Sequence, residues 1–518
     1  MALVSSVLMQ LPSEPKSILF FSILCFISVI MFMLKLKRKN NYNLPPSPPK
    51  LPIIGNLHQL GTLPHRSLQT LSKKYGPLML LQLGQTKTLV VSSADMAREI
   101  TKTHDVAFSN RPESTAAKIF LYGYQDIGFA PYGEEWRQKK KICVLDLLSQ
   151  KRMGSFHSIR QEEITELVDT IRDACASKRS SVNLREMLFA ASNNIVSRCV
   201  LGQKYDTPDG TTSIGVLARK NMKLLAAFSV GDFFPSLGWI DVLTGLISEI
   251  KSTSAALDAF FDEVIAQHKR SNKNDDKNDI KDFAGILLQL QEGGKLDFEL
   301  TQDNLKAILM DMYVGGSDTT STNLEWAFAE LVKNPNTMKK VQQEVRRVVG
   351  KKSKVDENDV NQMNYLKCVI KETLRLHPPV PLLIPRETIS SVKLKGYDIP
   401  PKTRVFMNAW AIQRDPELWD NPEEFLPKRF EGNQVDVKGQ DFQLIPFGIG
   451  RRGCPGISFG LASTENILAN LLYWFDWKLP KTGVLMQDLD MSEVNGLTVS
   501  KKIPLHLEPI LYSFGSKP

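Results

Sequence analysis

One segment near the C-terminal end, residues 446–456, constrains the fold of this 518-residue chain most strongly. It reads Pro-Phe-Gly-Ile-Gly-Arg-Arg-Gly-Cys-Pro-Gly and surrounds Cys454 with four glycines. Glycine permits backbone conformations that other residues avoid, so the segment is able to bend tightly. The apolar residues 457–475 follow, which predicts a buried helix with Cys454 at its N-terminal mouth. Amide donors and the helix dipole at such a place stabilise a thiolate.

Five positions of this segment, Phe447, Gly450, Arg452, Cys454 and Gly456, match the haem-binding loop F-x-x-G-x-R-x-C-x-G of the cytochrome P450 superfamily. With average residue usage, a chance match in such a chain has a probability on the order of 10⁻⁴. A lone cysteine would otherwise be a small buried hydrophobe. The resemblance implies a mainly α-helical cytochrome P450 fold with a small β-sheet subdomain. It also implies haem b (iron protoporphyrin IX) as cofactor, with Cys454 as the axial ligand of the iron.

A second segment, within residues 301–334, predicts one long helix that ends before Pro335. Gly315 and Gly316 lie in its middle, where each glycine costs about 1 kcal/mol relative to alanine. A threonine hydroxyl returned to a carbonyl one turn earlier would merely bend such a helix. Residues 315–320 resemble instead the oxygen-activating segment A/G-G-x-D/E-T-T/S of cytochromes P450. The resemblance implies that Thr319 hydrogen-bonds the oxygen molecule and that Asp318 relays protons.

Three further residues resemble the structural triad behind the haem. Glu372 and Arg375 are spaced to share one helix face, where an exposed pair contributes only about 0.2 to 0.5 kcal/mol. Residues 427–430 resemble the P-x-R-F element, which implies that Arg429 joins the pair. Lys428 stands where many family members have glutamate.

The haem propionates require cationic donors. Trp136 and Lys140 resemble the W-x-x-x-R element, with lysine in place of the usual arginine, so the bidentate fork of arginine is lost. Arg386 and Arg452 match two further propionate-binding positions of the family. A surface arginine is the alternative interpretation for each.

An uncharged apolar run, residues 18–34, is followed by four basic residues within positions 35–39. At about 1.5 Å per residue it crosses most of a roughly 30 Å hydrocarbon core, which predicts a single transmembrane anchor. A cleavable signal peptide is the alternative, but a small-residue cleavage site is lacking. The basic flank predicts that the following domain is cytosolic. The family resemblance implies the endoplasmic reticulum membrane.

These features predict four segments: a luminal lead (1–17), the transmembrane anchor (18–34), a basic and proline-rich hinge (35–60) and a haem-thiolate catalytic domain (61–518). Within the last, residues 78–83 and 88–91 are predicted strands, and most of residues 130–375 have helical periodicity. The polar residues 271–282 are predicted to form a solvated loop.

The charge and cysteine content exclude several classes of protein. The net charge is +9, but the basic residues are spread along the chain and no nucleic-acid-binding motif is present. The six cysteines form no zinc-like cluster and no disulfide framework, which predicts a reducing compartment. No flavin or nicotinamide fingerprint appears, so electrons must come from a separate protein, by resemblance the NADPH-cytochrome P450 reductase. Its predicted docking surface is the basic group Arg137, Lys139, Lys140 and Lys141.

The proline-rich spacer, the haem loop and residues 381–387 resemble the plant A-type group of microsomal cytochromes P450. The implied activity is a monooxygenase that uses O2 on a small lipophilic metabolite such as a terpenoid, phenylpropanoid, coumarin or alkaloid. By resemblance, the pocket is lined by residues 120–129, 228–234, 311–315, 380–384 and 496–498. A haem-thiolate isomerase or dehydratase that needs no O2 is the alternative, although such enzymes tend to lack the Asp-Thr pair. A non-catalytic haem carrier is a third.

Overall fold

The computed structural model describes residues 22–23, 26–27, 42–177, 181–205, 214–271, 282–294, 296–480 and 488–513. The predicted transmembrane anchor, residues 18–34, lies almost entirely outside these ranges, as does most of the predicted loop at 271–282. Among the residues that the structure describes, no helix is both long and apolar enough to span a membrane.

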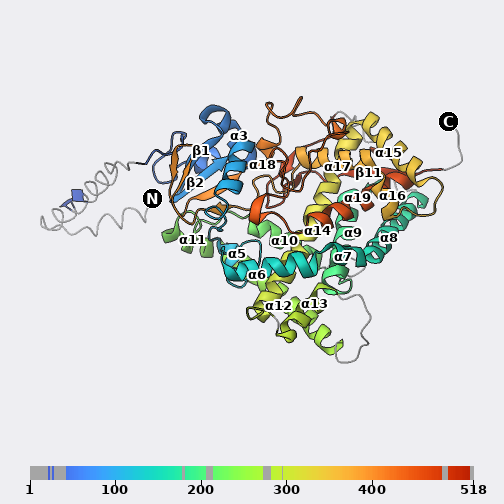
Figure 1. Ribbon diagram of the computed structural model, residues 1–518, viewed down its shortest axis with the longest axis horizontal. Coiled ribbons are helices and arrows are strands. Elements are labelled where there is room, and N and C mark those ends of the chain that lie inside the picture. Colours follow the sequence, from blue (N-terminus) through green and yellow to red (C-terminus); the bar gives the residue numbers. More distant parts are fainter. Residues whose placement is uncertain are drawn as a thin grey trace, which may run out of the picture.

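Helices make up most of the molecule, and the largest sheet lies at the end where the described chain begins (Figure 1). The longer helices are α3 (Pro64–Tyr75), α6 (Glu134–Ile142), α8 (His157–Ala176), α9 (Leu184–Leu201), α10 (Ile214–Leu225), α12 (Leu246–Ser271), α13 (Phe283–Gly293), α14 (Gln302–Lys333), α15 (Pro335–Val349), α17 (Asn364–Leu376) and α19 (Ile457–Trp474). The shorter ones are α4 (Ala94–Arg98), α5 (Thr115–Phe120), α7 (Gln150–Ser155), α11 (Trp239–Leu243), α16 (Glu357–Asn361) and α18 (Ala409–Ile412).

Helix α14 runs through the middle of the helical part and packs along α9 (Figure 1). The Thr301 side chain caps its first turn, and the Asn304 side chain bonds back to the N-cap in a capping box. Its last residue, Lys333, is followed by Asn334 and Pro335, where α15 begins. The sequence prediction of one long helix is confirmed.

Four strands form the largest sheet, in the order β1-β2-β7-β4. Strands β1 (Leu78–Leu83) and β2 (Thr86–Val91) form an antiparallel hairpin. Both predicted strands are confirmed, and the second begins two residues before the predicted position 88. Strand β7 (Arg404–Met407) pairs parallel to β2, and β4 (Arg386–Glu387) lies at the edge. The smaller sheets contain β3 (Val182–Asn183), β11 (His506–Leu511) and β8 (Phe475–Lys478); β5 (Val392–Leu394) and β6 (Tyr397–Ile399); and β9 (Glu493–Val494) and β10 (Ser500–Lys501).

The proline-rich segment is attached to this sheet. The N–H of Leu80 donates to the carbonyl of Pro46 at 2.9 Å, and the N–H of Asn56 donates to the carbonyl of Gln82 at 2.6 Å. The N–H of Asn43 also bonds to the carboxylate of Asp398 at 2.9 Å. The part of the predicted hinge that follows residue 42 is therefore fastened along the catalytic domain.

Candidate active site

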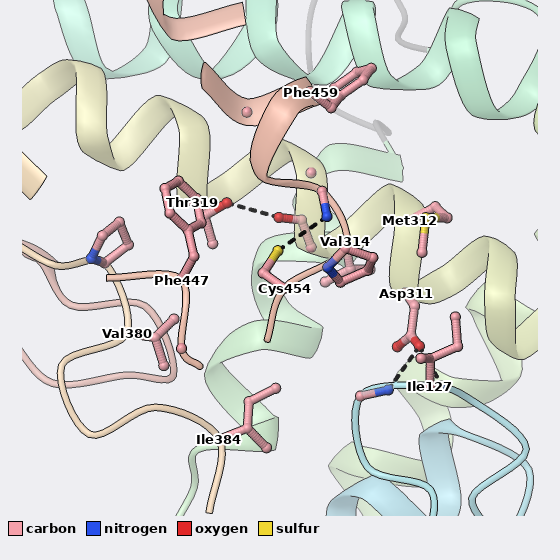
Figure 2. Close-up of a pocket in the computed structure, with 18 of the residues that line it drawn as sticks. Ile127, Asp311, Met312, Val314, Thr319, Val380, Ile384, Phe447, Cys454 and Phe459 are labelled. Carbon is pink, nitrogen blue, oxygen red and sulfur yellow. Dashed lines mark hydrogen bonds between the residues drawn. The ribbon is translucent and has the colours of Figure 1, made fainter. Parts of the chain in front are cut away.

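Cys454 lies at the end of a tight loop that leads into α19. The N–H of Cys454 donates to the carbonyl of Phe447 at 2.9 Å, which closes the loop. Gly450 has a φ of +66°, and a Cβ at this position would lie 2.8 Å from Oδ1 of Asp105. Only glycine satisfies both conditions. The Sγ of Cys454 accepts a hydrogen bond from the N–H of Gly456 at 3.3 Å (Figure 2).

The surroundings of Cys454 act on its thiol in opposite directions. Burial raises the pKa of Cys454, whereas the N–H of Gly456 and the charge of Lys140 lower it. The predicted amide donor is present, but burial outweighs it. A coordinating metal ion would remove the proton. Among the described residues no three His, Cys, Asp or Glu side chains form a metal site, so a metal ion at this sulfur requires further ligands from a cofactor.

A cavity of about 310 Å³ lies between Cys454 and α14. Val380, Ile384 and Phe447 project from one side of it, and Ile127 and the N-terminal part of α14 from the other (Figure 2). Residues of α9 and α10 complete a wall that is mostly apolar. Such a wall suits a flat apolar group and a lipophilic ligand.

Thr319 and Gly315 line this cavity from α14. The hydroxyl of Thr319 donates to the carbonyl of Gly315 at 2.8 Å (Figure 2). A Cβ on Gly315 would meet no described atom within 4 Å, whereas a Cβ on Gly316 would lie 3.1 Å from Val196 of α9. The two glycines therefore have different roles: Gly315 leaves room in the cavity, and Gly316 allows α9 to pack closely.

Asp318 is not part of the cavity wall that the described residues form. Burial raises the pKa of Asp318, and the hydroxyl of Thr498 opposes this effect, followed by the charges of Arg219 in α10 and Arg185 in α9. Arg219 in turn donates to the exposed carboxylate of Glu186 at 2.8 Å. Asp318 therefore lies outside the cavity wall, within the electrostatic influence of Arg219 and Arg185.

Arg452 is buried in the cavity wall against Trp136, with its guanidinium carbon 4.1 Å from the ring centre. It donates to the carbonyls of Ser109 (2.7 Å), Ile127 (3.2 Å) and Ala130 (2.6 Å). The indole N–H of Trp136 donates to the same Ile127 carbonyl at 3.0 Å. Both predicted cofactor-binding residues therefore also fix the segment that precedes α6.

Arg386 and Lys140 bring two more cations to the cavity wall. Arg386 donates to the carbonyl of Ile449, but its second terminal nitrogen, NH1, has no hydrogen-bond partner in the described part of the chain. The carboxylate of Asp105 lies 3.6 Å from that nitrogen. The ammonium of Lys140 donates to the carbonyl of Gly453, next to Cys454, at 2.7 Å.

Arg111 belongs to the same cluster, although no motif in the sequence marked it. Its guanidinium lines the cavity and donates to the carbonyls of Gly128 (2.7 Å), Ile384 (2.6 Å) and Pro385 (2.9 Å). An arginine before a proline is too common to predict such a role.

These cations fit a cofactor that carries carboxylates. Burial, followed by the charge of Arg386, lowers the pKa of Arg452 to about 9. Burial lowers the pKa of Arg386 to about 10 and that of Arg111 well below its ordinary value. A bound dianion would relieve this repulsion and occupy the unused donor of Arg386. Haem offers two propionates at the edge of a flat ring, so the cation cluster, the sulfur and the open helix face fit it.

The predicted triad joins Glu372 and Arg375 of α17 to Arg429 of the short 3-10 helix Pro427–Phe430. Arg375 binds the Glu372 carboxylate with two hydrogen bonds of 2.7 and 2.8 Å, and Arg429 donates to it at 3.0 Å. Glu372 and Arg375 are fully buried. The triad is therefore a buried network rather than the exposed pair that the spacing alone describes.

The basic group on α6 does not form one surface. Lys139 is only 1% exposed, and its ammonium bonds to the carboxylate of Glu135 at 2.8 Å. Lys140 lines the cavity, and only Arg137 and Lys141 are exposed. The prediction that Lys139 is a surface residue was wrong, because position 139 is one turn from the buried Trp136 on the same helix face.

One predicted wall of the pocket was also wrong. Residues 228–234 do not line the cavity formed by the described residues; Phe228 and Phe233 stack on each other at 5.1 Å. Met222 and Leu225 of α10 occupy the wall instead. The other predicted wall segments each contribute side chains: 120–129, 311–315, 380–384 and 496–498.

Comparisons with known proteins agree with this geometry. The profile of the cytochrome P450 family matches residues 45–505. A phenylacetaldehyde oxime monooxygenase of Prunus mume is 54% identical over 97% of this chain and 97% of its own. A desmethylyatein synthase of Sinopodophyllum hexandrum is 49% identical over 94% of this chain and 97% of its own.

A solved structure shows the same fold. A zebra fish cytochrome P450 with abiraterone superposes with a TM-score of 0.73 and 26% sequence identity, over 87% of this chain and 100% of the other. The family profile extends from the proline-rich segment to Leu505, the residue before β11. This chain belongs to the cytochrome P450 family and is a P450 monooxygenase of the plant A-type, with the haem-thiolate cofactor of that family.

Proposed function

We propose that this enzyme inserts one oxygen atom from O2 into a small lipophilic metabolite of plant specialised metabolism, with electrons from NADPH-cytochrome P450 reductase. The apolar cavity between Cys454 and the Gly315 and Thr319 face of α14 carries the proposal. Haem b bound there supplies the binding and activation of O2 and the oxidation of a C–H or C=C bond. The residues of the chain hold this group, deliver protons and position the substrate.

Cys454 is assigned as the axial ligand of the iron, within the loop that Phe447 and Gly450 shape. Arg452, Arg386 and Lys140 are assigned to the propionates, with Trp136 supporting Arg452; Arg111 joins them on its position in the cluster. Lysine at position 140 offers a single ammonium, which already donates to the carbonyl of Gly453. This hydrogen bond links Lys140, which is assigned to a propionate, to Gly453, the residue before Cys454.

Thr319 is assigned to hold a proton donor over the substrate side of the cavity. Its hydroxyl bonds to the Gly315 carbonyl, and a rotation about χ1 would turn it toward the open space that Gly315 leaves. Asp318 is assigned to pass protons from the Arg185 and Arg219 side of α14. The raised pKa of this buried carboxyl suits a group that takes up and releases a proton.

The substrate class follows from the wall and from the relatives. The cavity has few polar side chains, so it fixes an apolar ligand with a small number of directed contacts. One relative is named as a monooxygenase of phenylacetaldehyde oxime, a compound with a phenyl ring and one polar group. This compound is therefore the first probe for the present enzyme.

The reductase is proposed to dock beside α6, on the cysteine side of the haem. Arg137 and Lys141 are exposed there, and the apolar Val144 and Leu145 are 42% and 58% exposed in the following turns. Basic side chains around an apolar centre suit an acidic protein partner. Lys139 is buried and does not belong to this surface.

Attachment to the endoplasmic reticulum membrane is proposed for residues 18–34, with the domain from residue 61 on the cytosolic side. Exposed apolar side chains support a membrane-facing end: Trp239 and Leu243 of α11 are 57% and 76% exposed, and Ile53 is 82% exposed. The turn between β1 and β2 joins these segments, because Gln85 donates to the carbonyl of Phe233 and Gly84 to that of Ile54. The chain between the lead (1–17) and residue 42 would tether this end to the bilayer.

The test combines the purified full chain with the plant reductase, NADPH and O2. We expect phenylacetaldehyde oxime or a related aromatic compound to shift the haem toward high spin, and labelled oxygen from O2 to appear in the product. Product formed without NADPH and O2 would contradict the proposal and indicate an isomerase or dehydratase.

A further inference from the structure

Two aspartates that the haem and oxygen machinery do not use, Asp126 and Asp311, meet at the cavity wall. A Cβ on Gly128 would lie 3.4 Å from Oδ2 of Asp126 and 3.6 Å from Oδ1 of Asp311, so both carboxyls flank the same backbone position. Asp126 has no exposed surface, and Asp311 lines the cavity. Asp126 precedes α6, whereas Asp311 belongs to α14.

The two carboxyls hold three consecutive amides. Oδ2 of Asp311 accepts the N–H groups of Ile127 at 2.7 Å and Gly128 at 3.1 Å (Figure 2). Oδ2 of Asp126 accepts the N–H of Phe129 at 2.6 Å. Oδ1 of Asp126 is buried and has no hydrogen-bond partner within the described part of the chain. A buried carboxylate oxygen without a donor is costly unless it shares a proton.

The surrounding cations direct their hydrogen bonds to groups other than these two carboxyls. Lys139 from α6 directs its ammonium to Glu135 and to the carbonyl of Gln125. Arg111, before α5, and Arg452, from the haem loop, direct their guanidinium groups to backbone carbonyls in every hydrogen bond that the described residues show.

The other titratable groups that face the pair are neutral near pH 7: Cys143 after α6, whose thiol has a pKa raised by burial and by Asp311, and Tyr124, whose pKa burial also raises. No neighbour therefore neutralises both carboxyls by direct contact among the described residues.

We propose that Asp126 and Asp311 hold one proton between them and act as positioning residues, which fasten residues 127–129 to α14 as one wall of the substrate cavity. Loss of that proton places two negative charges side by side and loosens the wall. That the cavity receives a substrate rests on the function proposed above. The attachment of residues 127–129 to α14 does not.

The direction of the pH effect follows from the titration of the pair. Burial raises the pKa of Asp126 to about 6, and burial followed by the charge of Asp126 raises the pKa of Asp311 well above its ordinary value. A raised pKa means that the folded chain binds the proton more tightly than the unfolded chain does. The contribution to stability is therefore full below about pH 4, declines as the pH rises from there through the folded values, and is lost once the pH has passed them.

Hydrogen exchange of the holoenzyme tests the fastening directly. Exchange is followed at residues 126–129 from about pH 4.5, just above the unfolded pKa of an aspartate, to about pH 9. Labelling times are corrected for the intrinsic pH dependence, and the β1–β2 hairpin serves as internal reference. We expect protection of residues 127 and 128 to fall with rising pH, by at most about tenfold per unit for the loss of one proton. The rate at which carbon monoxide rebinds to the reduced haem after photolysis should rise over the same range.

Conservative and truncating variants separate charge from structure. Asp126→Asn and Asp311→Asn keep an oxygen for the amides but remove one charge. We therefore expect strong protection that depends less on pH than in the wild type, because one buried carboxyl remains to titrate. Asp311→Ala should lose protection several-fold at every pH, because the amides of Ile127 and Gly128 lose their acceptor. Glu465→Gln, which neutralises another buried acid on α19 with a raised pKa, is the matched control and should retain the wild-type profile.

The inference is overturned if wild-type protection is independent of pH, or if Asp126→Asn declines with pH as the wild type does. A variant that fails to fold is recognised by the loss of its carbon monoxide spectrum, and the other asparagine variant then decides. Neither readout involves a substrate or turnover. A negative result for the aspartate pair therefore does not contradict the proposed oxygenation. A failure to oxygenate likewise does not contradict the role of Asp126 and Asp311.

Discussion

At the scale of single residues, the hydroxyl of Thr319 has two possible partners, the Gly315 carbonyl that it bonds now and the proton donor that it is proposed to hold in the cavity. Thr319→Ala removes the hydroxyl without touching Cys454 or the cations, so haem content and substrate affinity should be retained. Product per NADPH consumed should fall several-fold and hydrogen peroxide should rise, with the 10² to 10⁴ typical of positioned proton transfer as an upper bound. Oxygen electrode and peroxide assays measure this coupling.

Two control variants make the test specific. Thr319→Ser restores the hydroxyl and should restore most of the coupling. Thr322→Ala removes a buried hydroxyl from the same helix away from the cavity and should leave the coupling unchanged. Undiminished coupling in Thr319→Ala would show that the hydroxyl serves only the Gly315 carbonyl.

Cys454 admits an equally direct test. Its loop contains no histidine and no second cysteine, so Cys454→Ala leaves no soft anionic ligand for an iron. We expect the reduced variant with carbon monoxide to lose the red-shifted band of a thiolate-ligated haem. A band that persists in the variant would assign the ligand elsewhere.

At the scale of elements, α6 presents two faces with opposite consequences for charge reversal. Lys141→Glu changes an exposed residue, so we expect normal folding but slower reduction by the reductase, with a weaker dependence on salt. Lys139→Glu puts a carboxylate at a buried position next to the carboxylate of Glu135 and should lower the yield of folded protein. Stopped-flow reduction at several ionic strengths checks the first; equal rates at all of them would exclude this surface.

The network on α17 predicts a larger effect on stability. Arg375→Met leaves the fully buried Glu372 with Arg429 alone, and breaking a buried ion pair in this way costs about 3 to 5 kcal/mol. Thermal unfolding of the holoenzyme should show the loss. Lys371→Met, a change at a partly exposed lysine of the same helix whose nearest carboxylate is 3.8 Å away, should shift the midpoint little. Similar midpoints for both variants would contradict a structural role for the triad.

Elements with a strong local pattern were predictable from the sequence. The hairpin of β1 and β2, the long α14 and the start of α19 after Cys454 all follow from periodicity, glycine positions and a terminating proline. The two sequence predictions that were wrong concern features that packing between distant segments determines. The face on which Lys139 lies is set by the contacts of α6, and the replacement of residues 228–234 by α10 in the wall is set by its packing against α14. Asp126 and Asp311 are far apart in the sequence, so no local pattern pairs them.

At the scale of the whole molecule, α11 lies at the end that also carries β1 and β2 (Figure 1). Its Trp239 and Leu243 are exposed, as is Ile53 in the segment that bonds to the β1–β2 turn. If this end faces the bilayer, removal of residues 2–41 should convert an integral protein into one that still binds vesicles weakly. Fully burying a large apolar side chain contributes roughly 1.5 to 3 kcal/mol. Replacing Trp239 and Leu243 together by Glu should therefore reduce vesicle binding of the truncated enzyme by at least about a hundredfold.

The assay compares four proteins: the full chain and the truncated chain, each with and without Trp239→Glu and Leu243→Glu. Their flotation with phosphatidylcholine vesicles measures the contributions of the N-terminal segment and of α11 separately. Leu418→Glu, at another partly exposed leucine, is the control for an added charge and should leave binding of the truncated chain unchanged. The full chain should resist extraction by high salt and alkali with or without the α11 substitutions, because residues 18–34 alone then hold it. If the truncated chain does not bind vesicles at all, or binds equally well with glutamate at both positions, the apolar end serves another purpose and attachment depends on the N-terminal segment alone.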